Sequence, residues 1–287
     1  MRVLAFDTSN YTTSVASFDG TAGHNISRLL DVEQGALGLR QSDALFAHVK
    51  RLPELADRLF SDIGTDAGFE AVGVSTRPRA VEGSYMPCFL AGESQARVLG
   101  AALGVPVLPF SHQQGHIAAS LWGSGHMELM DEPHLAWHLS GGTTDISAGQ
   151  LIDRTGKLLG LPFPSGKHID ALSRSAQDRQ VFRVKVQGTT FSLSGVQNKV
   201  EQYHAAGNSP EETAGYALRC LIGAIVRATE NALLEYHRSS VAFAGGVASN
   251  TLLRSSCAAL PAIFCPPQFA TDNALGVAVL TWRALHG

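Results

Sequence analysis

Short apolar runs bounded by Ser, Thr, Gly and Pro alternate with longer amphipathic stretches along this chain. The short runs predict β-strands, and the longer stretches predict α-helices because their apolar residues recur three and four positions apart. The predicted strands are residues 3–7, 14–17, 71–75, 105–108, 135–139 and 240–244. The predicted helices are residues 41–60, 90–104, 147–159 and 209–236, with others that begin near residues 111 and 271 and after the glycines at 245–246.

Two of the predicted strands enter turns of related composition. Residues 7–14 and 139–145 are both rich in small and hydroxyl-bearing residues, and they lie about 130 positions apart. Such turns expose backbone N–H groups and suit a phosphate or carboxylate. Either turn alone is most simply an ordinary hairpin, but the recurrence favours a duplicated phosphate-binding fold. Gly245 and Gly246 would also let a ligand approach the backbone beside a helix N-terminus, although a lone glycine pair is weak evidence.

Two histidines, His112 and His116, follow the strand at 105–108. Ser111 is a natural N-cap, so a helix that starts there carries both imidazoles on one face, close enough to hold one metal ion. Chance alone gives this spacing about 0.4 times in such a chain, so the spacing needs its structural context. His134 and His138 share the spacing but lie in a predicted strand, where four residues span about 13 Å and exclude a shared ion.

The composition is that of a folded protein with a large core. The 287 residues, 45% hydrophobic and 16% charged, fit one large domain or two small ones. No apolar run is long enough to span a bilayer, and residues 1–7 predict a first strand rather than a signal peptide. The four cysteines lack zinc-ribbon and CxxC spacing, so we expect buried, reduced thiols in a cytoplasmic protein.

The charge balance constrains any role with nucleic acid. The chain has 22 basic and 25 acidic residues and a net charge of −3. Surfaces that follow a phosphate backbone usually show an excess of Lys and Arg. A nucleic-acid surface on this chain must therefore be a local patch or come from a partner.

Six motifs in order give the chain a family resemblance over nearly its whole length. They are Asp7-Thr8-Ser9, residues 111–116 (SHQQGH), 140–143 (SGGT), 159–166 (LGLPFPSG), 244–250 (AGGVASN) and 267–273 (PQFATDN). The chain resembles the bacterial TsaD/Gcp family, the threonylcarbamoyltransferases of tRNA adenosine modification, once described as O-sialoglycoprotein endopeptidases. The resemblance implies the α/β, actin/hexokinase-like (ASKHA) fold, with two similar domains and a nucleotide cleft between them. We expect an N-terminal domain at 1–110, against which C-terminal helices pack back, and a C-terminal domain at 111–287 that carries the metal and nucleotide site.

The resemblance also implies the site residues. His112, His116 and Asp272 would be the metal ligands, for iron(II) or zinc. Asp272 alone would be most simply a helix cap. His138 occupies a position where archaeal and eukaryotic relatives place a metal-coordinating Tyr, so it could be a fourth ligand, and a satisfied strand histidine is an equal alternative. The adenine nucleotide or acyl-adenylate would be bound by His138, Leu139, Ser140, Gly141, Gly142, Asp153, Gly166, Gly245, Gly246 and Asn250. On sequence alone, Asp153 is an exposed helix carboxylate.

Several departures from the family pattern indicate a divergent paralogue. Gln150 stands where relatives carry an acidic residue, and Arg77-Pro78-Arg79 replaces their Gly-Pro-Gly loop. Residues 191–199 depart from their Ser-Phe-Ser-Gly-Leu-Lys motif. A strand that enters the turn at 140–143 should return as a second strand, because its edge is otherwise unpaired. Relatives are roughly twenty residues longer here. We therefore expect a segment absent from this sequence between Asp145 and Ile146, or else a true deletion.

The favoured function is transfer of a threonylcarbamoyl group from an adenylate donor to adenosine of tRNA. The metal would polarise the carbamoyl end, and the protein would position the reactants and stabilise charge. No catalytic side chain is assigned, because no Ser-His-Asp arrangement or reactive Cys is visible. One alternative is a carbamoyltransferase for a small molecule, and another is a non-catalytic partner of an active relative. A peptidase fits less well, because Gln113 replaces the Glu of His-Glu-x-x-His.

The expected partners follow from that function. They are the adenylate substrate, tRNA with the help of partner proteins, and a homo- or hetero-oligomer with a related subunit, with no membrane involved.

Overall fold

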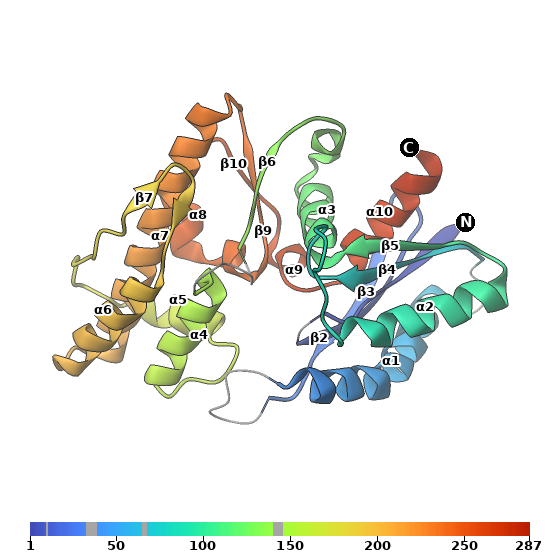
Figure 1. Ribbon diagram of the computed structural model, residues 1–287, viewed down its shortest axis with the longest axis horizontal. Helices are drawn as coiled ribbons and strands as arrows, with labels where there is room; N and C mark the ends of the chain where they lie inside the picture. Colours follow the sequence, from blue (N-terminus) through green and yellow to red (C-terminus); the bar gives the residue numbers. More distant parts are fainter. Residues whose placement is uncertain (10, 33–38, 65–67, 140–145) are drawn as a thin grey trace. The chain divides into compact units, whose positions relative to one another are not determined.

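Strand β1 (Arg2–Asp7) is buried along nearly its whole length, as the middle strand of a sheet covered on both faces. In the computed structural model the five-stranded sheet has the order β3-β2-β1-β4-β5 (Figure 1). Strands β2 (Thr12–Phe18) and β3 (Gly23–Leu29) extend it in antiparallel register, whereas β4 (Phe69–Arg77) and β5 (Val107–Ser111) are parallel to β1. The structure describes all residues except 10, 33–38, 65–67 and 140–145.

The two faces of this sheet are covered by different helices. Leu4 and Phe6 of β1 pack in one apolar cluster with residues of α1 (Gln41–Ile63) and α2 (Phe89–Leu103). Val3 and Ala5 point to the other face and pack with α3 (His112–Ser124) and α10 (Leu275–His286). This alternation is what a strand with a period of two requires when both faces are buried. A short 3₁₀ turn at Met127–Asp131 follows α3.

Helices α3 and α10 approach each other closely through glycines. A Cβ on Gly276 would lie 1.8 Å from the carbonyl oxygen of Gly115, so no other residue fits at position 276. A Cβ on Gly115 would in turn lie 3.1 Å from the side chain of Val277. This close packing fixes the loop that precedes α10 against the first turns of α3.

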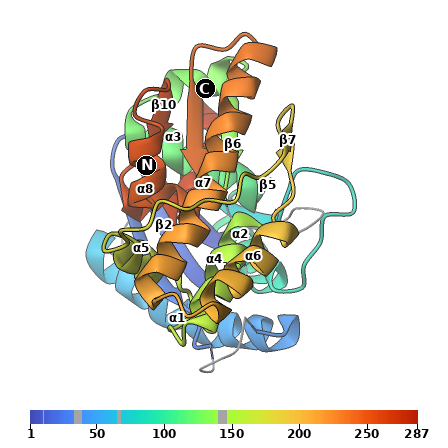
Figure 2. The same cartoon turned by 90° about the vertical axis from the view of Figure 1, so that its left-hand side faces the viewer.

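A second unit contains a smaller parallel sheet with the order β10-β9-β6. Its strands are β6 (Leu135–His138), β9 (Val241–Ala244) and β10 (Ala262–Phe264), and a hairpin is formed by β7 (Val186–Gln187) and β8 (Thr190–Phe191). Its helices are α4 (Ala148–Leu158), α5 (Gly166–Ser173), α6 (Ser194–Ala205), α7 (Pro210–Glu235) and α8 (Thr251–Ser256). The long helix α7 crosses this unit in Figure 2 and supplies the centre of its apolar core.

The first unit comprises Met1–Asp31, Gly38–Asp131 and Gln268–Gly287, and the second comprises Val32–Leu37 and Glu132–Pro267. Helix α9 (Pro267–Ala270) lies where the chain passes from the second unit to the first. The C-terminal helix α10 lies in the first unit. The boundary differs from the expected break at residue 110, because α3 packs on α10 and thus belongs to the first unit. The expected metal ligands at 112, 116 and 272 therefore also lie in the first unit.

Other predicted elements shift at their ends. The last helix begins at Leu275 rather than at Thr271, and the helix after Gly246 begins at Thr251, preceded by a 3₁₀ turn over Gly246–Ser249. The expected absence of a segment between Asp145 and Ile146 is not tested and stays a prediction. Asp145 lies outside the described residues. No helix among the described residues is both long and apolar enough to cross a membrane.

Candidate metal centre

The start of α3 is locked by a reciprocal pair of hydrogen bonds. The Ser111 hydroxyl accepts from the backbone N–H of Gln114 at 3.2 Å, and the Gln114 side-chain oxygen accepts from the N–H of Ser111 at 2.9 Å. This capping box satisfies donors that the first turn of a helix otherwise leaves unpaired. It fixes His112 at the first helical position, with His116 one turn later on the same side.

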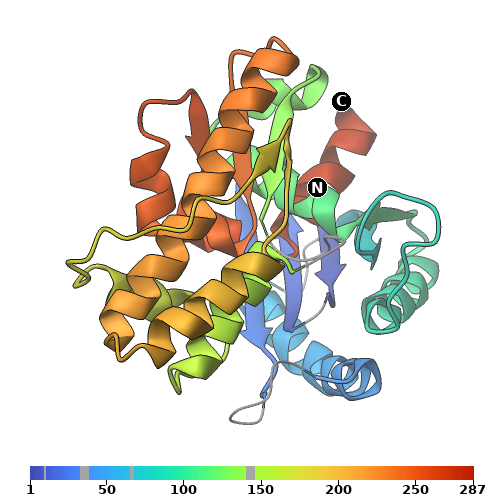
Figure 3. The ribbon, with the colours of Figure 1, turned by 60° about the vertical axis from the view of Figure 1, so that its left-hand side comes forward.

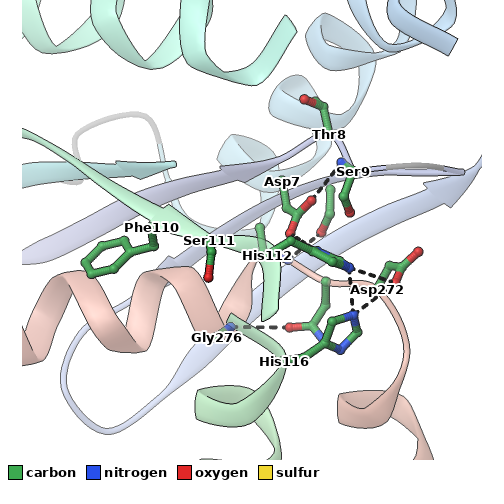
Figure 4. A network of polar contacts seen from close by, with 12 residues as sticks. Asp7, Thr8, Ser9, Phe110, Ser111, His112, His116, Asp272 and Gly276 are labelled. Atoms are coloured by element: carbon green, nitrogen blue, oxygen red, sulfur yellow. Dashed lines mark hydrogen bonds and ion pairs between the residues drawn. The ribbon is translucent and has the colours of Figure 1, made fainter. Parts of the chain in front are cut away.

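Three side-chain atoms converge beside this first turn. The Nε2 atoms of His112 and His116 are 2.9 Å apart, and Oδ1 of Asp272 lies 3.0 Å from Nε2 of His116 and 3.5 Å from Nε2 of His112 (Figure 4). Asp272 belongs to the loop that the packing of α3 on α10 holds in place. The structure therefore brings together all three residues that the family motifs imply as metal ligands.

A fourth residue orients this group from the end of β1. Oδ2 of Asp7 lies 2.8 Å from Nδ1 of His112, and its Oδ1 accepts the backbone N–H of Ser9 at 2.8 Å. A carboxylate beside Nδ1 holds the proton of a neutral imidazole there and leaves the Nε2 lone pair toward Asp272 and His116. The sequence alone does not reveal this role of Asp7, whose only signal is a carboxylate at a strand end within a family motif.

The charges of these groups are strongly coupled. Burial alone would lower the pKa of His112, but the charge of Asp7 and the hydrogen bonds to Asp272 and Asp7 outweigh it and raise that pKa to about 10. Burial opposes ionisation of Asp7 and Asp272, yet the histidines beside them hold the pKa of both carboxyls below the usual range. Two carboxylates and two imidazoles thus form a buried group that favours a cation in its centre.

The donor set and its dimensions fit a divalent metal. Bonds of about 2.0–2.1 Å at angles of 90–109° place neighbouring donors about 2.9–3.4 Å apart. The separations of 2.9 and 3.0 Å lie within this range, and the third, 3.5 Å, lies just above it. Two imidazoles with one carboxylate are typical of iron(II) and zinc sites with open coordination positions. The side chains of His112 and His116 are 12% and 2% exposed, so both imidazoles are largely buried. The side chain of Asp272 is 26% exposed and reaches solvent.

In the second unit the ends of β6 and β9 come together. The N–H of Leu139 donates to the carbonyl of Ala244 at 2.8 Å, and Gly245 has a φ of +89°. A Cβ on Gly245 would lie 3.0 Å from the backbone of Leu139, so the glycine is required both by its φ and by this close approach. Leu139 and Gly245, two of the predicted nucleotide-binding residues, are thus neighbours. Ser140, Gly141 and Gly142 lie outside the described residues.

Asn250 has a structural task in the same region. Its side-chain oxygen accepts the N–H of Leu253 at 3.0 Å, which makes it the N-cap of α8. The next N–H, of Thr251, donates to Asp170 of α5 at 3.0 Å, and the Thr251 hydroxyl donates to the same oxygen at 2.8 Å. Asp170 was not singled out from the sequence, because a contact across 81 residues leaves no local signal.

Asp153 differs from the exposed carboxylate expected of it. It is half-buried, and its Oδ1 accepts the N–H of Ser165, the residue before Gly166, at 2.8 Å. Burial raises the pKa of this carboxyl. Asp153 and Gly166 are therefore close through the 165–166 turn. His138, at the end of β6 beside Leu139, belongs to the second unit, and its role as a fourth metal ligand stays a prediction.

Comparison with known proteins decides the family. The family model of TsaD, tRNA N6-adenosine threonylcarbamoyltransferase, matches residues 34–279. The chain belongs to the TsaD family. A family member from Carboxydothermus hydrogenoformans, named tRNA N6-adenosine threonylcarbamoyltransferase, is 30% identical over 99% of this chain and 93% of its own length. One from Streptococcus suis with the same name is 29% identical over 95% of this chain and 89% of its own.

Solved structures confirm the fold class. A crystal structure of full-length HypF in a phosphate- and nucleotide-bound form has a TM-score of 0.59 at 13% identity, covering 99% of this chain and 56% of that protein. HypF from T. kodakarensis gives 0.61 at 14% identity, covering 99% of this chain and 48% of that protein. At such identities the likeness shows the fold alone. It is the actin/hexokinase-like α/β fold that the motifs imply for this TsaD-family chain.

Proposed function

We propose that this chain transfers a threonylcarbamoyl group from an adenylate donor to adenosine in tRNA, with one divalent metal held by His112, His116 and Asp272. The observation that carries the proposal is the convergence of these three donors, with Asp7 orienting His112, in a chain of the TsaD family. A metal bound there supplies Lewis-acid polarisation of the carbamoyl oxygen.

The chain's own residues would position the donor. We assign its adenosine to Gly245, Gly246 and Asn250, since a glycine pair after a strand lets a ligand approach the backbone. The acceptor amine attacks the carbamoyl carbon and forms a C–N bond. The bond from that carbon to the phosphate oxygen breaks, AMP leaves with the electron pair, and the amine loses a proton. Burial of His112 and His116 keeps water from their ring nitrogens, which strengthens electrostatic effects at this point.

A second candidate is carbamoyl transfer to a small molecule. The loop that replaces the family's Gly-Pro-Gly sequence lies against the start of the metal-binding helix, because the carbonyl of Pro78 accepts the N–H of Gln113 at 3.0 Å. The change from a glycine loop to Arg77-Pro78-Arg79 therefore occurs beside the candidate metal centre, where it can alter which acceptor enters. The acidic net charge of the chain points the same way.

Release of AMP from threonylcarbamoyl-adenylate, measured with and without tRNA, tests the proposal. The proposed function predicts release that depends on tRNA and is lost in His116→Ala. The matched control is His134→Ala, because His134 has the same four-residue spacing to a second histidine but is only partly buried and lies outside the candidate metal centre. Release that needs a small amine rather than tRNA would replace the proposal by the second candidate. Release in neither case, with metal and a related partner subunit present, would contradict both and leave a non-catalytic subunit.

A further inference from the structure

An extended segment of the second unit runs along helix α7 and is fastened to it by side chains of the helix. In Figure 3 this segment, residues 177–188, is the yellow coil that crosses α7 and leads into strand β7. At its start, Glu212 accepts the N–H groups of Gln177 and Asp178 at 2.7 and 3.0 Å. Further along, Arg219 donates to the carbonyl of Gln180 at 3.0 Å.

Hydrogen bonds between α7 side chains and the backbone of the segment continue to its far end. The N–H of Phe182 donates to the sulfur of Cys220 at 3.2 Å, Arg227 donates to the carbonyl of Val184 at 2.8 Å, and Asn231 donates to the carbonyl of Gly188 at 2.8 Å. Glu212 and Asn231 are 19 residues apart, about 28 Å of helix. The segment is therefore held in an extended form over its whole length.

The side chains of this segment divide between two faces. Phe182, Val184 and Val186 are buried or half-buried and join the apolar core of the second unit. The alternate residues Arg179, Val181, Arg183 and Lys185 are all exposed, as alternate residues of an extended chain share one face. We call this outward row the basic row.

The three cations of the basic row are not neutralised locally. Arg179, Arg183 and Lys185 span six residues, about 20 Å of extended chain. Their side chains make no hydrogen bond or ion pair with any residue that the structure describes. Of the nearby carboxylates, Glu212 is occupied by two backbone N–H groups and Asp178 by the Tyr203 hydroxyl and the N–H of Gln180.

A hollow of about 400 Å³ lies next to the basic row. It is lined by Arg183 and Lys185 from the segment and by Arg227, Glu230 and Asn231 from α7, with two valines of the segment. Three cations against one carboxylate give the hollow a net positive charge, in a chain whose overall charge is −3. Such a site fits a phosphate group, because Arg and Lys both donate to phosphate oxygens and Asn adds a neutral donor.

We propose that the basic row and this hollow bind successive phosphates of an RNA backbone, and that this is the local patch through which an acidic chain holds its tRNA. The inference rests on the proposed function for the identity of the RNA. Three outward cations in a row favour a linear polyanion over a single free phosphate, which would occupy the hollow alone. Because the extended backbone is already fixed to α7, little backbone conformational entropy is lost on binding.

The test measures binding of total tRNA to the whole protein by fluorescence anisotropy. It is done at several salt concentrations with no adenylate donor present. The variant is Arg183→Glu/Lys185→Glu, and the matched control is Arg58→Glu/Arg238→Glu, which changes the net charge equally at exposed positions outside the row. We expect the variant to bind on the order of tenfold more weakly and to lose about two units of the slope of log affinity against log salt, and the control to stay near wild type.

Three outcomes would overturn the proposal. The first is equal affinity for tRNA in variant and control, and the second is wild-type protein that binds no tRNA at about 50 mM salt, roughly a third of physiological ionic strength. Millimolar inorganic phosphate that abolishes tRNA binding in wild type at constant ionic strength would reduce the site to a single-phosphate pocket and also contradict the row. Circular dichroism and the melting temperature show whether the variants fold. Because no donor is used, binding through the row can persist when the proposed reaction fails, and the reaction can proceed when the row is not used.

Discussion

Replacement of Asp7 by Asn tests how the metal centre is oriented. Asp7 offers one oxygen to the N–H of Ser9 and the other to Nδ1 of His112, each at 2.8 Å. Asn has a single oxygen. If that oxygen stays on Ser9, its amide group donates to Nδ1, which forces the imidazole proton onto Nε2 and removes the lone pair needed by a metal. If the amide turns over, its NH₂ faces the N–H of Ser9.

Either arrangement weakens metal binding without a change in side-chain size. Loss of such an orienting carboxylate typically costs 10–100-fold in metal affinity, equivalent to about 1.4–2.7 kcal/mol. The assay is competition for zinc between the apoprotein and a chromophoric chelator, with Asp19→Asn as control. Asp19 accepts two backbone N–H groups but is hydrogen-bonded to no histidine ring. An Asp7→Asn variant that folds and binds zinc within threefold of wild type, while His112→Ala does not bind, would refute this reasoning.

Four further predictions concern the two candidate sites. In the metal-free protein the pKa of His112 is raised to about 10, above its unfolded value of about 6.5. The stabilisation by protonated His112 is therefore complete below about pH 6.5 and is lost as the pH rises through 10. Urea unfolding of apo wild type and of His112→Ala across this pH range measures that stabilisation. Metal must displace that proton, so zinc binding at pH 7 should release protons into a weakly buffered solution, and no release would count against the coupled group. Gly245→Ala should destabilise the protein by about 1–3 kcal/mol more than Gly207→Ala. Both glycines have φ near +90°, but of the two only Gly245 has backbone atoms where a Cβ would lie. Equal losses of unfolding free energy in urea would contradict a close approach at Gly245. Millimolar AMP should raise the melting temperature of wild-type protein, and the absence of any shift would contradict a nucleotide site.

Local signals in the sequence predicted the parts of the site that depend on neighbouring residues. The cap at Ser111 and the spacing of His112 and His116 follow from helix geometry, and both are seen in the structure. The place of Asp272 beside them came from the family motif, since its partner lies 156 residues away. The last helix is expected near Thr271 but begins at Leu275, and Gly276 in its first turn packs on Gly115.

The contacts that the sequence could not predict join distant segments. Asp7 reaches His112 across 105 residues because β1 and β5 lie in one sheet, an arrangement set by strand order rather than by local pattern. The fastening of residues 177–188 to α7 depends likewise on six side-chain contacts to a backbone of irregular structure. Apolar and charged residues alternate over residues 182–186, as they do in many short strands. Only the fold shows that the charged residues of this segment form one outward row.

The most direct test of the proposed function is mass analysis of nucleosides from a transfer reaction. The protein is loaded with iron(II) or zinc and mixed with threonylcarbamoyl-adenylate and total tRNA. A parallel sample also contains a related partner subunit. The account predicts threonylcarbamoyl-adenosine in the digest of the wild-type reaction, and its absence with His116→Ala. Unmodified adenosine in every sample, with AMP released only when a small amine is supplied, would contradict transfer to tRNA.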